Sequence, residues 1–212
     1  MKSKYYKPSE KTNVFLDIQI LSDEKILIDF HTDGLYNVGI LGATGAVGQE
    51  MMKILAERSF PVGELRLLAS RHSAGREING HIVVEACREN FEGLDIILGA
   101  AENDIAERFV DDIKASGAVF IDNSSAFRLC PDVPLVVPEI NPEDVKKHKG
   151  VIANPNCTTV ISCTAVNALN AVSPIESMVV SSYQAVSGAG AAGPKELFGE
   201  VEALAKGESY EP

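Results

Sequence analysis

The feature that most restricts the fold is the regular alternation of short apolar runs and helical periods from Tyr36 onward. Short apolar runs indicate buried strands, and apolar residues three and four positions apart indicate one face of a helix. The alternation predicts an α/β fold with a parallel sheet covered on both faces. Strands are expected at 36–41, 65–69, 94–98, 118–121 and 151–153, and helices at 47–58, 103–116 (capped by Asn103) and 141–147 (opened by Pro142).

Three parts are expected along the chain. Residues 1–35 form an N-terminal extension of unknown role, in which two β-rich runs, 14–20 and 25–30, could pair as a hairpin. Residues 36–157 form the α/β domain. Residues 158–212 begin a second domain. After its first helix we expect only one strand, one loop and one further helix, which are too few for a complete domain. Its expected elements are a helix at 158–169, a strand at 177–185, a glycine-rich loop at 187–193 and a helix at 194–206 that Gly207 ends.

Charge and cysteine content exclude several classes of protein. With 19 Lys and Arg against 30 Asp and Glu, the net charge is −11, which argues against a nucleic-acid partner because phosphate binding needs a basic face. No apolar run approaches the roughly 20 residues of a membrane span, and no apolar core of a secretory signal follows the N-terminal lysines. The spacing of Cys87, Cys130, Cys157 and Cys163 predicts no zinc or other metal site. We expect reduced thiols and a cytoplasmic protein.

A glycine-rich turn, Gly42-Ala43-Thr44-Gly45-Ala46-Val47-Gly48, joins the first strand to the first helix. Gly42 would permit the tight turn, Gly45 the approach of a pyrophosphate, and Gly48 close packing of the helix. The helix N-terminus offers N–H groups to phosphate. A glycine turn without a ligand has the same spacing, but the strand before it and the helix after it favour a dinucleotide-binding Rossmann domain.

The end of the second strand indicates which dinucleotide binds. An NAD site usually has Asp or Glu there, to bind the ribose 2′-hydroxyl. Here the chain has Ser70, Arg71 and Ser73 and no carboxylate, which favours the 2′-phosphate of NADP. The alternative is that Arg71 and Arg76 are only solvated surface charges.

Cys157 lies between the strand 151–153 and the helix that follows. Active sites of α/β sheets lie at such carboxyl ends, and a helix N-terminus favours the thiolate, which is the nucleophilic form. Backbone N–H groups of the turn and the side chain of Asn156 could stabilise an oxyanion. The alternative is that Cys157 is a small buried apolar residue; Cys163 is assigned to the core.

Two further segments carry polar residues expected at the same edge. Asn123 and Arg128 follow the strand 118–121, and the guanidinium of Arg128 suits an anion such as phosphate or a carboxylate. Gln184, at the end of the β-run 177–185, could orient a substrate. Each of these residues could instead stabilise its own loop.

Taken together, these motifs resemble aspartate-semialdehyde dehydrogenase, from about Tyr36 to the C-terminus. The resemblance implies NADP dependence, a Rossmann domain followed by an α+β catalytic and dimerisation domain, and a homodimer or homotetramer. The residues that carry it are the glycine turn, Ser73-Ala74-Gly75, 122–128, Val136-Val137-Pro138-Glu139-Ile140-Asn141, 154–158 and 183–190.

The resemblance also assigns roles to individual residues. It implies that Cys157 is the nucleophile that forms an acyl thioester, that Gln184 contacts the substrate, and that Arg128 binds phosphate. Asn156 and Asn123 belong to the same catalytic and phosphate-binding motifs. The implied cofactor contacts are Gly42, Thr44, Gly45, Ala46, Val47, Ser70, Arg71, His72, Ser73, Ser187 and Gly188.

The implied activity is that of an NADP-dependent, phosphorylating aldehyde dehydrogenase. It reduces L-4-aspartyl phosphate to L-aspartate 4-semialdehyde with release of phosphate, a step toward lysine, threonine and methionine. Another acyl-phosphate or acyl-CoA reductase of the same fold, such as N-acetyl-glutamyl-phosphate reductase or malonyl-CoA reductase, is an alternative.

The sequence departs from the family's pattern in three places. Residues 1–35 have no counterpart in that pattern. His72 stands where the family commonly has Arg, with Arg71 one position earlier. The family's acid/base His, substrate-carboxylate Arg and phosphate-binding Lys would lie beyond Pro212. We therefore expect poor turnover by the 212-residue chain alone, and a truncated, non-catalytic NADP-binding homologue is a further alternative.

Overall fold

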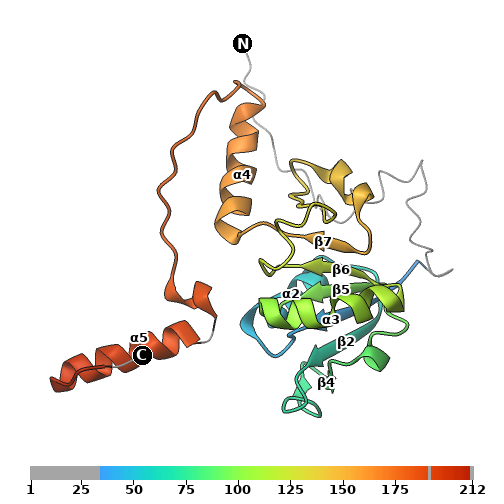
Figure 1. Ribbon diagram of the computed structural model, residues 1–212, viewed down its shortest axis with the longest axis horizontal. Helices are drawn as coiled ribbons and strands as arrows, with labels where there is room; N and C mark the ends of the chain where they lie inside the picture. Colours follow the sequence, from blue (N-terminus) through green and yellow to red (C-terminus); the bar gives the residue numbers. More distant parts are fainter. Residues whose placement is uncertain (1–33, 191, 211–212) are drawn as a thin grey trace. The chain divides into compact units, whose positions relative to one another are not determined.

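The computed structural model describes residues 34–190 and 192–210 (Figure 1). The described chain falls into two compact units, and the division lies between Val160 and Ile161. The expected hairpin of runs 14–20 and 25–30 lies outside the described residues. In the described part of the chain, no helix is both long and apolar enough to cross a membrane.

The first unit is built on a seven-stranded sheet in the order β3-β4-β2-β1-β5-β6-β7. Every pair of neighbours is parallel except β3 and β4, so the predicted Rossmann-type parallel sheet is confirmed. The strands are β1 (Tyr36–Leu41), β2 (Val62–Ala69), β3 (Glu77–Ile78), β4 (His81–Glu85), β5 (Ile96–Gly99), β6 (Val119–Asp122) and β7 (Val151–Ala153).

The antiparallel pair β3 and β4 was not among the expected strands. Its sequence signal is the dipeptide Asn79-Gly80, because the type I′ turn of a two-residue hairpin needs positive φ at both central positions, which Asn and Gly adopt most easily. The observed φ angles are 50° at Asn79 and 81° at Gly80. Asn-Gly between short β-runs would have been sufficient to predict this hairpin.

Successive side chains of the central strands point to opposite faces of the sheet, and a separate hydrophobic core lies on each face. Ile40 packs with Met52 and Leu55 of helix α2 (Ala46–Glu57) on one face. Leu41, the next residue, packs with Phe109 of helix α3 (Asn103–Ser116) on the other face, where α3 lies in front of the sheet in Figure 1. Because both faces are covered, the buried parts of the central strands, such as residues 38–41 of β1 and 67–69 of β2, are continuously apolar.

Two of the expected helix details differ from the structure. Glu102, not Asn103, is the N-cap of α3, and the side chain of Asn103 instead bonds with Ser125 in the loop after β6. The expected helix at 141–147 is the 3-10 helix η2 (Pro142–Lys147). A second 3-10 helix, η1 (Arg88–Asn90), precedes β5.

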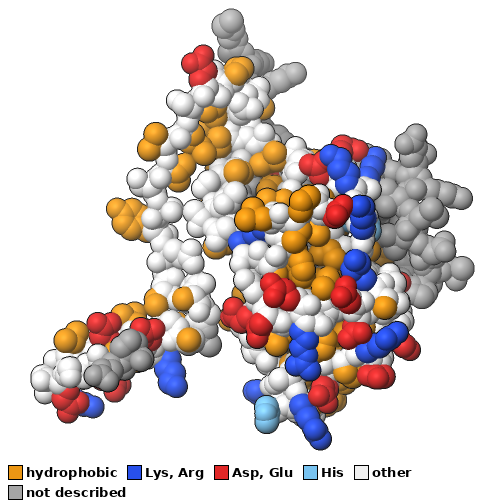
Figure 2. Space-filling view, in the orientation of Figure 1, with side chains coloured by type: hydrophobic (Ala, Val, Ile, Leu, Met, Phe, Trp, Pro, Cys, Tyr) orange, Lys and Arg blue, Asp and Glu red, His pale blue; other side chains and the backbone are white. Residues whose placement is uncertain are grey.

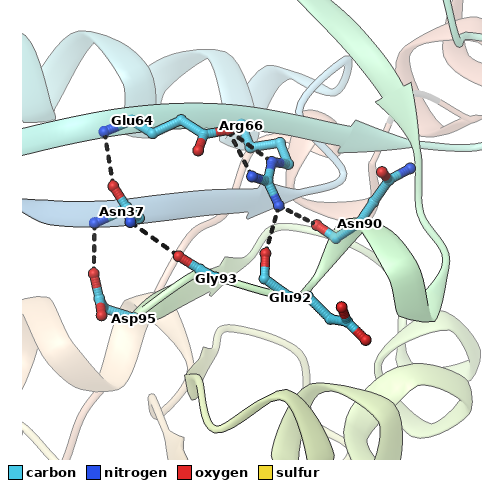
Figure 3. Close-up of polar contacts among 7 residues, drawn as sticks. All are labelled: Asn37, Glu64, Arg66, Asn90, Glu92, Gly93 and Asp95. Carbon is cyan, nitrogen blue, oxygen red and sulfur yellow. Dashed lines mark hydrogen bonds and ion pairs between the residues drawn. The ribbon is translucent and has the colours of Figure 1, made fainter.

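A polar network ties β1 and β2 to the loop that precedes β5 (Figure 3). Arg66 Nη1 donates to the carbonyl oxygens of Asn90 and Glu92, both at 2.9 Å. The backbone N–H of Asn37 donates to Asp95 Oδ2 at 2.7 Å. These bonds satisfy backbone groups of an irregular loop, so they fix the point at which β5 enters the sheet.

The second unit carries two helices, α4 (Cys157–Asn170), which begins in the first unit, and α5 (Ala192–Lys206). The 3-10 helix η3 (Val186–Ala189) precedes α5, and α5 ends where Gly207 takes a φ of 74°, as predicted.

The expected strand at 177–185 is wrong, because this segment has no regular structure. Val179 is 97% exposed and Tyr183 99% exposed, and hydrophobic side chains stand out along this segment in Figure 2. A β-rich sequence forms a strand only where neighbouring strands supply hydrogen bonds and a packing surface, and the described residues supply neither here.

Candidate functional site

Six parallel strands, β4, β2, β1, β5, β6 and β7, end at one edge of the sheet, and the loops that follow five of them carry the residues discussed below. The residues directly after β1, β2, β5, β6 and β7 are Gly42, Ser70, Ala100, Asn123 and Asn154. Strand β2 lies on one side of β1 and strand β5 on the other. The direction in which successive strands are added to the sheet therefore reverses at β1. Ligands of open α/β sheets bind in the crevice outside the carboxyl ends at such a point.

The glycine turn after β1 is shaped by close backbone contacts. Gly42 has a φ of 88°, and a Cβ atom there would lie 2.7 Å from the carbonyl oxygen of Ala100. A Cβ at Gly48 would lie 2.6 Å from the carbonyl oxygen of Gly42. Tight turning at Gly42 and close packing at Gly48 are therefore confirmed as the reasons for glycine.

Gly45 differs from these two glycines because its surroundings are open. The nearest atom to a Cβ there is the Gly42 carbonyl oxygen, at 3.4 Å. Gly45 is the N-cap of α2, and the next two residues, Ala46 and Val47, form the exposed first turn of that helix. Gln49 Nε2 donates to the Thr44 carbonyl oxygen at 3.1 Å and steadies the turn. The backbone here is open to a ligand; contact with a pyrophosphate stays a prediction.

The loop after β2 is short, and its own backbone bonds hold it in place. The carbonyl oxygen of Ser70 accepts from the N–H of Ser73 at 2.8 Å, and the N–H of Gly75 donates to Val83 of β4 at 2.8 Å. Ser70, Arg71 and His72 are exposed on this frame, and Ser73 is half-buried. The loop thus presents hydroxyl, guanidinium and imidazole groups beside the strand end.

Arg128 joins the ends of β6 and β7. Its Nε donates to the carbonyl oxygen of Asn154 at 2.8 Å, and its Nη2 donates to the carbonyl oxygen of Asn123 at 2.8 Å. The side chain of Asn154 also donates to the side-chain oxygen of Asn123. Two nitrogens of the expected anion ligand are therefore bonded to backbone, and an anion would meet the Nη1 side of the guanidinium.

A buried carboxylate lies directly behind these residues. Asp122, the last residue of β6, is 0% exposed. Its Oδ2 accepts from the Ser124 hydroxyl at 2.6 Å, and its Oδ1 accepts from the Ser124 N–H at 3.1 Å. Burial raises the pKa of Asp122, while the bonds from Ser124 and the charge of Arg128 act in the opposite direction. No role for Asp122 was predicted from the sequence, although an Asp at the end of an apolar strand could have indicated a buried polar group.

Cys157 is exposed and is the first residue of α4, three positions after Asn154. The side-chain oxygen of Asn156 accepts from the N–H of Thr158 at 3.0 Å, so Asn156 helps to cap this helix. In the described part of the chain Cys157 is not buried, and its role as a nucleophile stays a prediction. Cys163, assigned to the core, is only half-buried, because α4 has no buried residue.

The remaining predicted site residues, Gln184, Ser187 and Gly188, belong to the second unit. Gln184 and Gly188 lie against each other, because a Cβ at Gly188 would overlap the side-chain amide of Gln184. The structure thus groups these residues with one another, and their approach to Cys157 stays a prediction. In the described part of the chain, no group of three or more His, Cys, Asp or Glu side chains is placed to hold a metal ion.

Comparison with known proteins gives the family. Residues 37–148 match the model of the semialdehyde dehydrogenase NAD-binding domain, and residues 166–212 match that of the semialdehyde dehydrogenase dimerisation domain. Aspartate-semialdehyde dehydrogenase of Synechocystis is 49% identical over 164 residues, covering 76% of this chain and 48% of that protein. The Bacillus subtilis enzyme is 42% identical over 180 residues, covering 83% of this chain and 52% of that protein.

Solved structures agree with the sequence relatives. Aspartate semialdehyde dehydrogenase II from Vibrio cholerae is 41% identical with a TM-score of 0.76, covering 84% of this chain and 55% of that one. The Candida albicans enzyme with NADP is 26% identical with a TM-score of 0.57, covering 66% of this chain and 48% of that one. The chain spans about half the length of the curated relatives it matches. It belongs to the semialdehyde dehydrogenase family and resembles the family's aspartate-semialdehyde dehydrogenases.

Proposed function

We propose that the protein is an NADP-dependent aspartate-semialdehyde dehydrogenase. It would interconvert L-4-aspartyl phosphate and L-aspartate 4-semialdehyde in the biosynthesis of lysine, threonine and methionine. The observation that carries the proposal is the position of Cys157: an exposed thiol at the start of a helix, on the same sheet edge as the glycine turn. A relative of known structure, the Vibrio cholerae enzyme, was solved in complex with ASA, which supports this substrate.

The proposed reaction uses two properties of a thiolate, which is both a good nucleophile and a good leaving group. In the oxidative direction the sulfur of Cys157 adds to the aldehyde carbon, and backbone N–H groups at the start of α4 meet the resulting oxyanion. Bound NADP would supply the acceptor for the hydride that leaves this carbon. Phosphate then attacks the acyl thioester, forming the acyl phosphate and returning the thiolate, a good leaving group. Arg128, through its Nη1 side, and Gln184 would hold the phosphate and the substrate.

The geometry of the sheet supports a dinucleotide along this edge. Neighbouring strands lie about 4.8 Å apart, so four spacings from β2 to β7 amount to roughly 19 Å. An elongated cofactor could therefore reach from the loop after β2 to Cys157, with its pyrophosphate at Gly45 and its 2′-phosphate at Ser70, Arg71, His72 and Ser73. The Candida albicans neighbour was solved with NADP, which agrees with this choice of cofactor.

The choice of NADP over NAD is tested by removing one charge. Losing a charge-assisted hydrogen bond costs about 1.5–3 kcal/mol, so Arg71→Ala should weaken NADPH binding roughly 10- to 150-fold. NADH binding should change little. Arg76→Ala is the matched control, since it removes an exposed arginine from the other end of the same loop. Equal weakening of both cofactors by Arg71→Ala would mean that Arg71 is structural.

The covalent step is tested by trapping the acyl enzyme. The protein is mixed with NADP and aspartate semialdehyde without phosphate, and the adduct is located by peptide mass spectrometry. We expect the acyl group on Cys157, its release when phosphate is added, and its absence in Cys157→Ser but not in the control Cys163→Ser. A protein that binds NADPH but forms no adduct would instead be a nucleotide-binding homologue without activity.

The proposed partners and setting follow from the same family. We propose a homodimer or homotetramer, supported by the match of residues 166–212 to a domain described as the dimerisation domain. The proposed compartment is the cytoplasm, where thiols stay reduced. Sedimentation of the native protein, measured with and without NADPH, tests the assembly.

A further inference from the structure

The loop after β6 contains a linked set of three side chains, Asp122, Ser124 and Arg128, which we call the brace. Asp122 is fully buried, and both of its oxygens accept hydrogen bonds from Ser124. The Ser124 hydroxyl in turn accepts from the N–H of Ala126 at 3.1 Å. The carboxylate therefore fixes the turn of chain that leads to Arg128.

The fold makes room for this carboxylate. A Cβ at Gly99, on the neighbouring strand β5, would lie 2.9 Å from Asp122 Oδ1. Gly99 leaves open the space that the carboxylate occupies beside β5. A buried carboxylate is costly unless hydrogen bonds and charge compensate for its lost hydration. Here the compensation comes from Ser124 and Arg128.

The brace extends from β6 to β7 through Arg128. In the sheet Asp122 pairs with Ala153, and the N–H of Asn154 donates to the Asp122 carbonyl oxygen at 2.8 Å. Arg128 then bonds the carbonyl oxygens of Asn123 and Asn154, which are the first residues beyond the two strands. The paired strand ends are thus held both by the ladder and by the guanidinium.

Cys157 lies just beyond this point. Three residues after Asn154 the chain begins α4 with Cys157, and β7, the strand before it, has only three residues. So short a strand offers few ladder bonds to fix the start of α4. The guanidinium of Arg128 supplies one additional bond, to the carbonyl oxygen of Asn154, three positions before the helix begins.

We propose that the brace positions Cys157, a role separate from any contact of Arg128 with an anion. It holds the junction of β7 and α4 so that the first turn of the helix stays formed around the sulfur. This inference deepens the proposed function, because the group positioned is the proposed nucleophile. Its test needs no turnover and no cofactor.

The experiment measures alkylation of Cys157 by iodoacetamide in phosphate-free buffer, followed by peptide mass spectrometry across a range of pH. The decisive variant is Ser124→Ala, which changes no charge and leaves the guanidinium in place. The matched control is Ser116→Ala at the opposite end of β6, because Ser116 also donates one bond, to Ile113, and accepts one, from Ala118. Arg128→Lys, at a half-buried site, keeps the charge but cannot bridge two carbonyls in the same way.

We expect Ser124→Ala and Arg128→Lys to slow alkylation of Cys157 about three- to fivefold, the size of a helix-terminal effect on a charged group. The midpoint of the rate against pH should move upward in both variants. Ser116→Ala should leave the rate and the midpoint unchanged, even if it lowers the free energy of unfolding. Half-buried Cys163 serves as an internal reference in every digest.

The result that overturns the inference is an alkylation rate and pH midpoint equal to the parent's in folded Ser124→Ala and folded Arg128→Lys. A second arm adds inorganic phosphate and measures protection of Cys157. If Arg128 were only an anion ligand, Arg128→Lys would change protection by phosphate and leave the phosphate-free rate unaltered. Failure of the acyl-trapping experiment leaves this test intact, because iodoacetamide reports on the thiol alone.

Discussion

Replacing Gly42 with alanine should destabilise the protein more than alanine at Gly45, because Gly42 combines a positive φ with a close backbone contact. An L-residue at the observed φ of 88° costs about 1–2 kcal/mol. The added Cβ would also lie 2.7 Å from the Ala100 carbonyl oxygen, a backbone atom of the neighbouring strand's loop that cannot rotate away. Such overpacking typically costs about 1–3 kcal/mol. We expect Gly42→Ala to lower the free energy of unfolding by about 2–5 kcal/mol.

The assay is urea unfolding followed by far-ultraviolet circular dichroism, because the chain has no tryptophan to report by fluorescence. A loss of this size is a large fraction of the roughly 5–15 kcal/mol that stabilises a typical domain. The midpoint should fall while the slope of free energy against urea stays constant, since the surface exposed on unfolding is the same.

Gly45→Ala is the control, three residues further along the same turn. Gly45 has a φ of −78°, and a Cβ there would be 3.4 Å from its nearest neighbour, so neither strain nor overlap arises. Its expected cost is about 1 kcal/mol or less, from replacing glycine at a helix N-cap. NADPH affinity should nevertheless fall if the pyrophosphate binds at Gly45 as proposed, because the new methyl group fills space that is open there. Equal unfolding midpoints for Gly42→Ala and Gly45→Ala would refute the reasoning.

Three further predictions concern positions outside the turn. Burial lowers the pKa of His148 below its ordinary value of about 6.5, so the unfolded chain takes up a proton that the folded chain does not. Stability should therefore fall as pH drops through about 6.5, and His148→Gln should flatten this part of the urea-midpoint profile. Arg66→Met removes bonds to the Asn90 and Glu92 carbonyls and should cost about 1–2 kcal/mol in urea unfolding with NADPH affinity unchanged; a loss of affinity would contradict a purely structural role. The bond from Lys149 lowers the pKa of exposed Asp132, yet Asp132→Asn should leave the melting temperature unaltered, since water screens such pairs; a clear decrease would show that this ion pair contributes to stability.

Only those parts of the site that depend on neighbouring residues could be predicted from the sequence. Cys157 and the glycine turn were found because a strand, a turn and a helix follow one another within a few residues. Asp122 lies within the segment 122–128, but its burial depends on Gly99 of another strand, which no local pattern reveals. The bond from Arg128 to the carbonyl oxygen of Asn154 joins residues 26 positions apart, and no local pattern predicts it either.

What the sequence determined by itself is the α/β class, the place of the glycine turn and the end of α5 at Gly207. Periodicity and the φ that only glycine adopts easily are properties of neighbouring residues, so they can be read from the sequence alone. Which segments pair as strands with residues far away in the sequence was decided by the tertiary structure. Residues 177–185 have β-forming composition but no strand beside them in the described chain, and so remain irregular. The short β7, by contrast, is held between β6 and a bridge from Leu135, because those partners are brought to it by the fold.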